Sequence, residues 1–387
     1  MPEGWAFGYR DAGGVTRMLH GAATPAPGPD PEPFTVPRVR LRGLAGRSRA
    51  RTAAELPLVT AGVGGSTVLE VKWATSQPSA GALAAAPLAT LVDDLAWAAD
   101  NGLRVMLRTY AGIYAPGFVR TAAGNIAPWY SKDNPPTYDW EAIPGGLANW
   151  TKPAFATAYR DWNLRLRDAI GDHAALAAVT MSLPMTEYAE PCLKQYSYAA
   201  NRASAKAAGI TTDADLDAFE RGFEIHKEVW SAAGVATACA YNTHQGLNAA
   251  GEMEASMSRT LALMDRQLAI LGKFCVWENN SLMDPDVGYA PMYAKMAEGH
   301  ADPAKKVTLH FQTRTTDKHK IAWKPTAKTS PARTFARAVA LGANSVEFPT
   351  GGMDAVSKGG ATIWDAFTLA QAAKVNSDLA SNTPVWP

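Results

Sequence analysis

Short β-rich runs alternate with longer segments of helical periodicity from residue 66 onward, and this alternation predicts a (β/α)8 TIM barrel. Glycine turns close predicted helices directly before the next strand, as at Asn101-Gly102 and Ala233-Gly234. The chain has 387 residues, enough for one large barrel. We therefore predict a single domain over residues 1–387, in which parallel strands are joined by crossover helices.

Seven runs are strand candidates because they are rich in β-branched and apolar residues. They are residues 67–73, 103–110, 177–183, 235–241, 273–278, 306–312 and 343–348. An eighth strand is needed for closure, and residues 15–20 are the most plausible candidate. This eighth assignment places the missing strand before the other seven.

The helices between the strands have clear apolar faces. Aromatic and aliphatic residues recur at three- and four-residue spacing in two long segments: Phe155, Tyr159, Trp162, Leu166 and Ile170, and then Leu216, Phe219, Phe223 and Trp230. Thr212 or Asp213 is a plausible cap of the second helix. These aromatic residues are expected to be core residues.

Two segments interrupt the alternation. Residues 22–51 form a Pro- and Arg-rich N-terminal strap, with Pro-rich residues 22–37 followed by a basic stretch that is either an exposed edge strand or a solvated arm. Residues 111–153 form a long insertion that contains Trp129, Tyr130, Tyr138, Trp140 and Trp150. Such a loop is uncommon unless functional. Its aromatic residues form either a lid or subsite wall, or contacts that fasten the loop to the barrel.

Composition excludes several classes of partner. The chain has 37 basic and 36 acidic residues, so it lacks the positive charge of a protein that neutralises nucleic-acid phosphates. No apolar run approaches the ~20 residues that span a bilayer, and the start has no basic and apolar signal segment. We expect a cytoplasmic protein, or a virion tail protein if phage-encoded. The three cysteines form no CxxC pair and are expected in the core.

Residues at the carboxyl ends of barrel strands build the active site in this fold. The candidates there combine aromatic rings, amides, carboxylates and single cations. The catalytic candidates are Glu187, Glu278 and Glu347; the substrate-binding candidates are Trp73, Arg108, Tyr110, Tyr188, Tyr241, Asn242, His244, Trp277, Asn279, His310, Gln312 and Arg314. The expected substrate is a carbohydrate, because rings stack on pyranose faces, amides and arginine bind hydroxyls, and two carboxylates can flank a glycosidic bond.

Motifs for other chemistries are missing from the sequence. Phosphate-binding GxxxxGK[ST] and GxGxxG loops, HExxH and GxSxG do not occur, and the histidines are scattered. We therefore expect no cofactor and no metal, although Asp284 and Asp286 faintly resemble part of a calcium loop. His244 and His310 are expected to contact substrate or to be satisfied rim residues. Glu70 and Lys72 are expected to form an ion pair inside the barrel.

Three segments resemble the front half of a clan-A (β/α)8 glycoside hydrolase of the β-galactosidase or endoglycanase type. They are VLEVKWATSQPSAG, GLRVMLRTYAGIYAPGFV and AAVTMSLPMTEYAEP, and the likeness covers about a third of the chain. The third segment resembles the strand that bears the acid/base glutamate. The resemblance therefore implies a glycosidase in which Glu187 is the general acid/base.

The sequence departs from that family pattern at two positions. Thr186 stands where the family usually has asparagine, and Gln312 stands where it has the nucleophilic glutamate at the end of the seventh strand. A second carboxylate would come from Glu278 or Glu347. The alternative is a non-catalytic carbohydrate-binding barrel, such as a phage tail or virion component that recognises host cell-wall glycan. Homo-oligomerisation or virion assembly is compatible with either function, and a barrel enzyme on another polyhydroxylated substrate is a third option.

Overall fold

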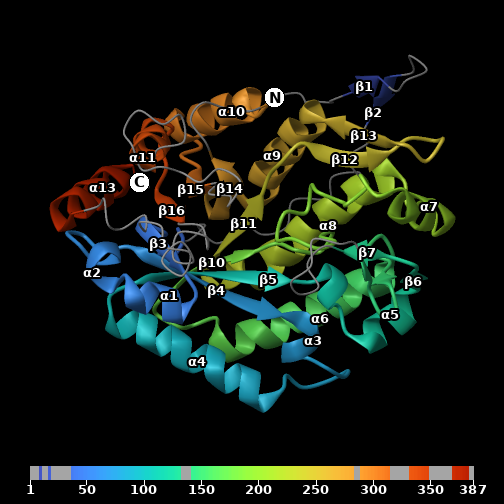
Figure 1. The fold of residues 1–387 in the computed structure, drawn as a ribbon, viewed down its shortest axis with the longest axis horizontal. Helices are drawn as coiled ribbons and strands as arrows, with labels where there is room; N and C mark the ends of the chain where they lie inside the picture. Colours follow the sequence, from blue (N-terminus) through green and yellow to red (C-terminus); the bar gives the residue numbers. More distant parts are fainter. Residues whose placement is uncertain are drawn as a thin grey trace, which may run out of the picture. The chain divides into compact units, whose positions relative to one another are not determined.

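Eight parallel strands close into a barrel in a computed structural model that describes residues 8–10, 16–18, 36–131, 141–282, 288–313, 331–347 and 368–382 (Figure 1). In chain order the barrel strands are β3 (Gly43–Arg47), β4 (Ser66–Lys72), β5 (Arg104–Tyr110), β10 (Leu176–Thr180), β11 (Ala236–Ala240), β14 (Cys275–Leu282), β15 (Thr308–Thr313) and β16 (Ser345–Glu347). β16 pairs with β3 and completes the ring. The predicted (β/α)8 barrel and all seven later strands are confirmed.

The assignment of residues 15–20 as the eighth barrel strand is wrong. Within that run, β2 (Thr16–Met18) pairs antiparallel with β1 (Gly8–Arg10) and joins no barrel strand. These strands lie in a compact unit of residues 1–35, and the barrel lies in a second unit of residues 36–387. Our expectation of one domain over the whole chain stays a prediction.

The first barrel strand is β3, which lies inside the predicted N-terminal arm. Residues 43–51 are not an arm, because they form β3 and the start of helix α1 (Arg49–Ala54). The arginines obscured the strand, but Leu44 and Ala45 are completely buried. A Cβ on Gly46 would lie 2.3 Å from Thr52 Oγ1, so the close contact between β3 and α1 requires glycine. Residues 22–35 of the strap lie outside the described residues.

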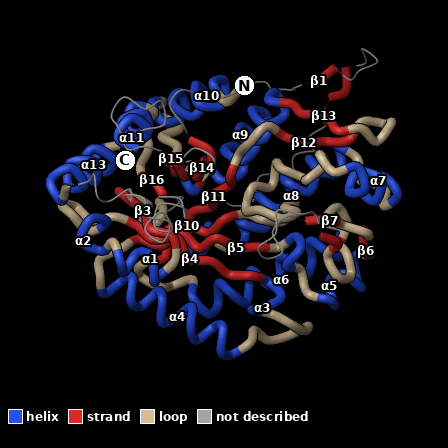
Figure 2. Tube along the Cα trace, in the orientation of Figure 1, coloured by secondary structure: helices blue, strands red, loops and turns tan. Residues whose placement is uncertain are grey.

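Helices surround the barrel, as Figure 2 shows by the blue segments around the red strands. They are α2 (Leu56–Val59), α3 (Trp73–Ser76), α4 (Ala85–Asp100), α6 (Pro153–Ile170), α7 (Ala199–Ala207), α8 (Thr212–Val229), α9 (Met257–Leu271), α10 (Ala290–Ala301), α11 (Pro331–Ala340) and α13 (Leu369–Ser381). The predicted apolar face of α6 is buried. The cap of α8 is Thr211, not Thr212 or Asp213. Among the described helices, none has the length and apolar character needed to cross a membrane.

The described residues of the insertion, 111–131 and 141–153, contain several small elements of secondary structure. They include η1 (Gly112–Tyr114), α5 (Gly117–Ala123) and the short strands β6 (Asn125–Ile126), β7 (Tyr130–Ser131), β8 (Glu141–Ala142) and β9 (Leu147–Ala148). Trp129 and Trp150 are buried and meet edge to face at 6.1 Å. Both rings also belong to the main hydrophobic core cluster, so they fasten the insertion to the core. Tyr138 and Trp140 lie outside the described residues.

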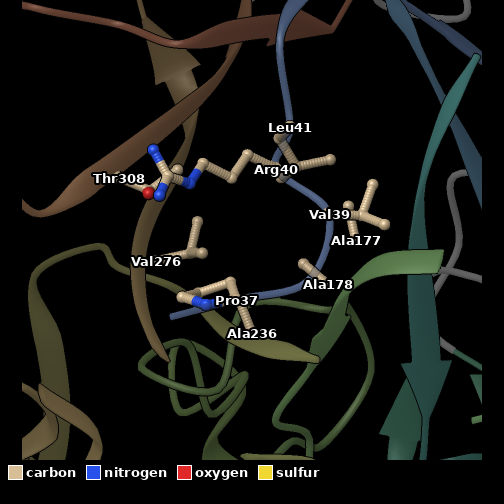
Figure 3. Close-up of a pocket in the computed structure, with 9 residues that line it drawn as sticks. All are labelled: Pro37, Val39, Arg40, Leu41, Ala177, Ala178, Ala236, Val276 and Thr308. Carbon is tan, nitrogen blue, oxygen red and sulfur yellow. The ribbon is translucent and has the colours of Figure 1, made fainter. Parts of the chain in front are cut away.

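The barrel interior is apolar at its N-terminal end. Val68, Met106, Ala178, Ala238 and Val276 pack there as one cluster. Figure 3 shows residues 37–41 passing this end of the barrel, with Pro37, Val39 and Leu41 lining a pocket shared with the first residues of the strands. The pocket is too small for a sugar. This end of the barrel is therefore a packed core, and polar interior side chains occur toward the other end.

Gly65 is expected to tolerate no side chain. An added Cβ would lie 2.2 Å from the carbonyl oxygen of Leu44 and 2.7 Å from that of Val59, and backbone atoms cannot rotate away. Gly65→Ala should therefore lower the free energy of unfolding by about 1–3 kcal/mol, measured by chemical denaturation. Gly117→Ala is the control, because its Cβ would come no closer than 3.8 Å to Arg120 Nη2. Equal stability of the two variants would contradict this account of the β3–α2 contact.

Candidate functional site

Four buried polar residues lie inside the barrel toward the carboxyl ends of its strands. Arg108 on β5 and Glu278 on β14 each lie two residues after a member of the apolar cluster, Met106 and Val276. The other two residues are His310 on β15 and Glu347 on β16. Glu278 is in register with His310, and Gln312 is in register with Glu347. Because alternate residues of a strand share a face, these side chains continue the inward-facing rows. We call Arg108, Glu278, His310 and Glu347 the inner cluster.

Arg108 binds both carboxylates of the inner cluster. Its Nη2 donates to Glu278 Oε1 at 2.5 Å and to Glu347 Oε2 at 2.7 Å, and its Nη1 donates to Glu347 Oε1 at 3.2 Å. All three side chains are at most 1% exposed. Burial opposes the charged forms of Arg108 and Glu347, but their opposite charges outweigh it. The pKa of Arg108 is raised, and the Arg108 guanidinium holds the pKa of Glu347 well below its usual range.

A second group lies beside the inner cluster at the ends of β3, β4 and β5. Arg47 Nη2 lies 2.6 Å from Glu70 Oε1, which also accepts a hydrogen bond from Tyr110 Oη at 3.2 Å. Arg47 Nε lies 3.8 Å from Glu347 Oε1. The predicted ion pair between Glu70 and Lys72 is wrong, because Glu70 binds Arg47 and the Lys72 ammonium lies over the Tyr114 ring at 4.7 Å. Sequence reasoning missed Arg47 because it stood in the presumed arm.

His310 is completely buried and lies between the two carboxylates in the order of the strands. Its Nε2 is 3.7 Å from Glu347 Oε2, beyond hydrogen-bond distance. In the part of the chain that the structure describes, neither ring nitrogen has a hydrogen-bond partner, and neither does Glu278 Oε2. One ligand atom from each of Glu278, His310 and Glu347 lies within 4.8 Å of the other two. This spacing is compatible with a bound cation.

Glu187 lies on the buried loop that follows β10. The neighbouring Thr186 carbonyl accepts a hydrogen bond from Ile113 N at 2.8 Å, and a Cβ on Gly112 would come within 2.1 Å of that oxygen. Gly112, at φ +42°, therefore lets the η1 turn pack against this loop. Glu187 is buried and Tyr188 half-buried. The backbone next to Glu187 is therefore held against the η1 turn, which follows β5.

His244 belongs to a buried charged network. On β12 (His244–Leu247), which pairs with β13 (Met253–Ser256), its Nε2 lies 2.9 Å from Asp215 Oδ2. Lys194 Nζ lies 2.8 Å from Asp215 Oδ1, and the indole N–H of Trp150 donates to the same oxygen at 2.7 Å. Burial opposes ionisation of Asp215, but Lys194 and His244 lower its pKa. These contacts hold the His244 ring in the buried network. The apolar face of α8 is the one signal in the sequence that Asp215 would be buried.

Several further candidates form hydrogen bonds with neighbouring side chains or backbone. Tyr241 Oη donates to Gln267 Oε1 at 3.0 Å, while Asn279 Nδ2 donates to the Tyr241 carbonyl at 2.7 Å. Asn242 Nδ2 donates to Glu190 Oε1 at 2.8 Å, so Glu190 is a carboxylate of this region that sequence reasoning missed. Gln312 is the penultimate residue of β15 and is half-buried. Arg314, Asp284 and Asp286 lie outside the described residues.

The expected sugar-stacking role of Trp73 and Trp277 is wrong in this structure. Trp73 is completely buried and stacks on Trp162 with ring centroids 5.0 Å apart. Trp277 packs on α10, where a Cβ on Gly299 would lie 2.4 Å from its ring. Neither indole has a free face for a pyranose. The three cysteines are free and buried, as predicted.

No family model and no curated protein matches the chain. Solved structures with a similar fold include a β-glycosidase, BGL167 (11% identity, 86% of each chain, TM-score 0.47), and endo-glycoceramidase II from Rhodococcus sp. (13%, 82% of this chain and 75% of that chain, TM-score 0.45). The exo-β-1,4-mannosidase Op5Man5 from Opitutaceae bacterium strain TAV5 aligns with 99% of this chain and 62% of its own (11%, TM-score 0.44). A D-allulose 3-epimerase from Methylomonas sp. is also similar (10%, 89% and 99%, TM-score 0.42).

These four proteins differ in their named activities, and all TM-scores are below 0.5, so the fold assignment rests on the observed closed sheet. The chain is a (β/α)8 barrel, which is the fold that its resemblance to clan-A glycoside hydrolases implies.

Proposed function

We propose that the chain is a glycoside hydrolase that acts on an oligo- or polysaccharide. The observation that carries the proposal is the state of Glu278, a buried carboxylate near the middle of the sixth barrel strand. Arg108 holds its Oε1, while its Oε2 has no hydrogen-bond partner among the described residues. One oxygen fixes the orientation of the carboxylate, and the other is available to react.

Glu347 has a different role in this proposal. Both of its oxygens accept hydrogen bonds from Arg108, so the carboxylate holds the guanidinium against Glu278. A carboxylate bound through both oxygens is a poor nucleophile and a poor acid. We therefore replace the expectation that Glu347 reacts with a positioning role, in which it acts through Arg108.

Glu187 is proposed as the general acid. It would transfer its proton to the glycosidic oxygen as the bond from that oxygen to the anomeric carbon breaks. Glu278 Oε2 would either attack the anomeric carbon, forming an ester that water hydrolyses with Glu187 as base, or take a proton from the attacking water. A carboxyl separation of about 5–5.5 Å corresponds to the first course and about 6.5–9.5 Å to the second.

The test is reducing-end release from a panel of bacterial wall glycans and β-linked oligosaccharides. Glu187→Gln and Glu278→Gln should each lower the rate by about 10²–10⁴-fold, because each removes an acid–base or nucleophilic group. Glu298→Gln, at an exposed position on α10, is the matched control and should keep the wild-type rate. NMR of the first anomer released distinguishes retention from inversion. Unchanged activity of both active-site variants would rule out the assignment.

The rival function is carbohydrate binding without cleavage, for instance by a virion component that contacts cell-wall glycan. Gln312 supports this alternative, because an amide stands where the family that this chain resembles carries its nucleophilic glutamate. Glycan binding by the wild type without release of any reducing end, and with binding unchanged in Glu278→Gln, would favour the rival.

A further inference from the structure

The structure assigns a second capacity to the inner cluster: we infer that Glu278, His310 and Glu347 bind one divalent transition-metal ion of the zinc class. Three neighbouring strands, β14, β15 and β16, each supply one ligand. The expectation from sequence was that no metal binds, because no local ligand motif is present. The candidate ligands lie 32 or more residues apart in the chain, and only barrel closure brings them together.

The ligand spacing is close to that of a tetrahedral site. One ligand atom from each residue lies within 4.8 Å of the others, and His310 Nε2 is 3.7 Å from Glu347 Oε2. Ligands bound at about 2.0–2.2 Å to zinc are about 3.3–3.6 Å apart in a tetrahedron. Side-chain movements on the order of 1 Å would complete the site. Imidazole nitrogen and carboxylate oxygen are both zinc ligands, and the nitrogen ligand favours zinc or cobalt over magnesium or calcium.

The hydrogen-bonding state of His310 is the second, independent observation. The side chain is completely buried, and within the described ranges neither Nδ1 nor Nε2 has a hydrogen-bond partner. Ser345 Oγ, whose residue is in register with His310, has none either. Buried polar atoms without partners are costly, and a metal on one imidazole nitrogen would remove part of that cost.

Charge also favours a cation at this position. Among the described groups, two cations, Arg47 and Arg108, face three anions, Glu70, Glu278 and Glu347, which leaves one negative charge when His310 is neutral. Arg108 uses Oε1 of Glu278, so Oε2 can bind a metal without loss of that ion pair. An uncompensated buried charge is unfavourable, and a divalent cation would offset it.

Metal binding has a consequence for catalysis that rests on the proposed function. A metal on Glu278 Oε2 would occupy the oxygen that the hydrolysis requires. Zinc should therefore inhibit the proposed glycosidase, and a chelator should restore its rate.

The test is titration of chelator-treated full-length protein with cobalt(II) chloride, followed by visible absorption. Wild type should bind one cobalt ion per chain with absorption bands in the visible range, and zinc should displace it. His310→Gln and Glu347→Gln should weaken binding by at least about tenfold, since loss of one ligand weakens a three-residue site strongly. His173→Gln, at a partly exposed turn outside the cluster, is the matched control and should bind as wild type does. Circular dichroism confirms that each variant is folded.

Two results would overturn the inference: no cobalt spectrum in the wild type, or equal cobalt affinity in wild type and His310→Gln. An NMR signal of an imidazolium at His310 in metal-treated protein would also overturn it, because a proton would then supply the missing positive charge. The absorption readout does not depend on hydrolysis. If the protein binds cobalt but its metal-free form cleaves no glycan, the metal site stands and the proposed function is rejected. If the metal-free form cleaves glycan but the protein binds no cobalt, the function stands and the metal site is rejected.

Discussion

Arg108→Met is expected to destabilise the chain by about 3–5 kcal/mol, because it leaves two buried carboxylates without their shared cation. Both carboxylates are completely buried, and three hydrogen bonds join them to the guanidinium. The carboxylates would have to take up protons or draw in water. Urea denaturation of the variant and the wild type measures the change.

Two further variants test whether the loss of stability in Arg108→Met comes from the unpaired carboxylates. Arg108→Met combined with Glu278→Gln and Glu347→Gln should recover much of the lost stability, because neutral amides do not need the cation. Arg160→Met removes an exposed pair with Glu228, whose side chains are 44% and 52% exposed, and should cost at most about 1 kcal/mol. The account fails if Arg108→Met is no more destabilising than Arg160→Met, or if the triple variant is less stable than Arg108→Met alone.

Stability is expected to fall steeply as pH decreases from about 6.5 toward 3. Burial lowers the pKa of His226 to about 3, and its Nε2 lies 2.9 Å from Tyr159 Oη while its Nδ1 lies 3.3 Å from Thr237 Oγ1. An unfolded histidine has a pKa of about 6.5. Between these two values the unfolded chain binds a proton that the folded chain does not, so acid favours unfolding. The contribution is complete above about pH 6.5 and is lost as pH falls through that window.

The expected slope for His226 is about 1.4 kcal/mol of unfolding free energy per pH unit inside the window. Urea denaturation at several pH values measures it. His226→Gln should flatten the curve by about that amount, while His244, whose pKa is also lowered by burial, should still contribute in the variant. His173→Gln is the comparison at a partly exposed site. An unchanged slope in His226→Gln would show that His226 takes up its proton in the folded state.

Local patterns were sufficient for most of the barrel. Alternating strand and helix periods located the later strands, and the spacing of Phe155, Tyr159 and Trp162 identified the buried face of α6. Strand β3 was not predicted, because arginines surround its short run of glycine, leucine and alanine. That run becomes a strand only because β16 and β4 lie on either side of it and supply its hydrogen bonds.

The residues of the candidate site could be predicted from the sequence, but the contacts between them could not. Arg108, Glu278, His310 and Glu347 were all found by collecting polar residues at strand ends, since parallel strands deliver those ends to one side of a barrel. Which carboxylate meets the arginine depends on the register between strands. Arg47 and Glu70 show the same limit, because their contact joins β3 and β4 through pairing that no local pattern specifies.

By itself, therefore, the sequence determined the barrel, its core helices and the polar character of its strand ends. Only the tertiary structure decided which face each side chain takes. Trp277 and Glu278 are adjacent in one strand, yet the tryptophan packs outward on α10 and the glutamate joins Arg108 inside the barrel. Successive strand residues point to opposite faces, so a sugar-binding ring and a core ring look alike until the surrounding helices are in place.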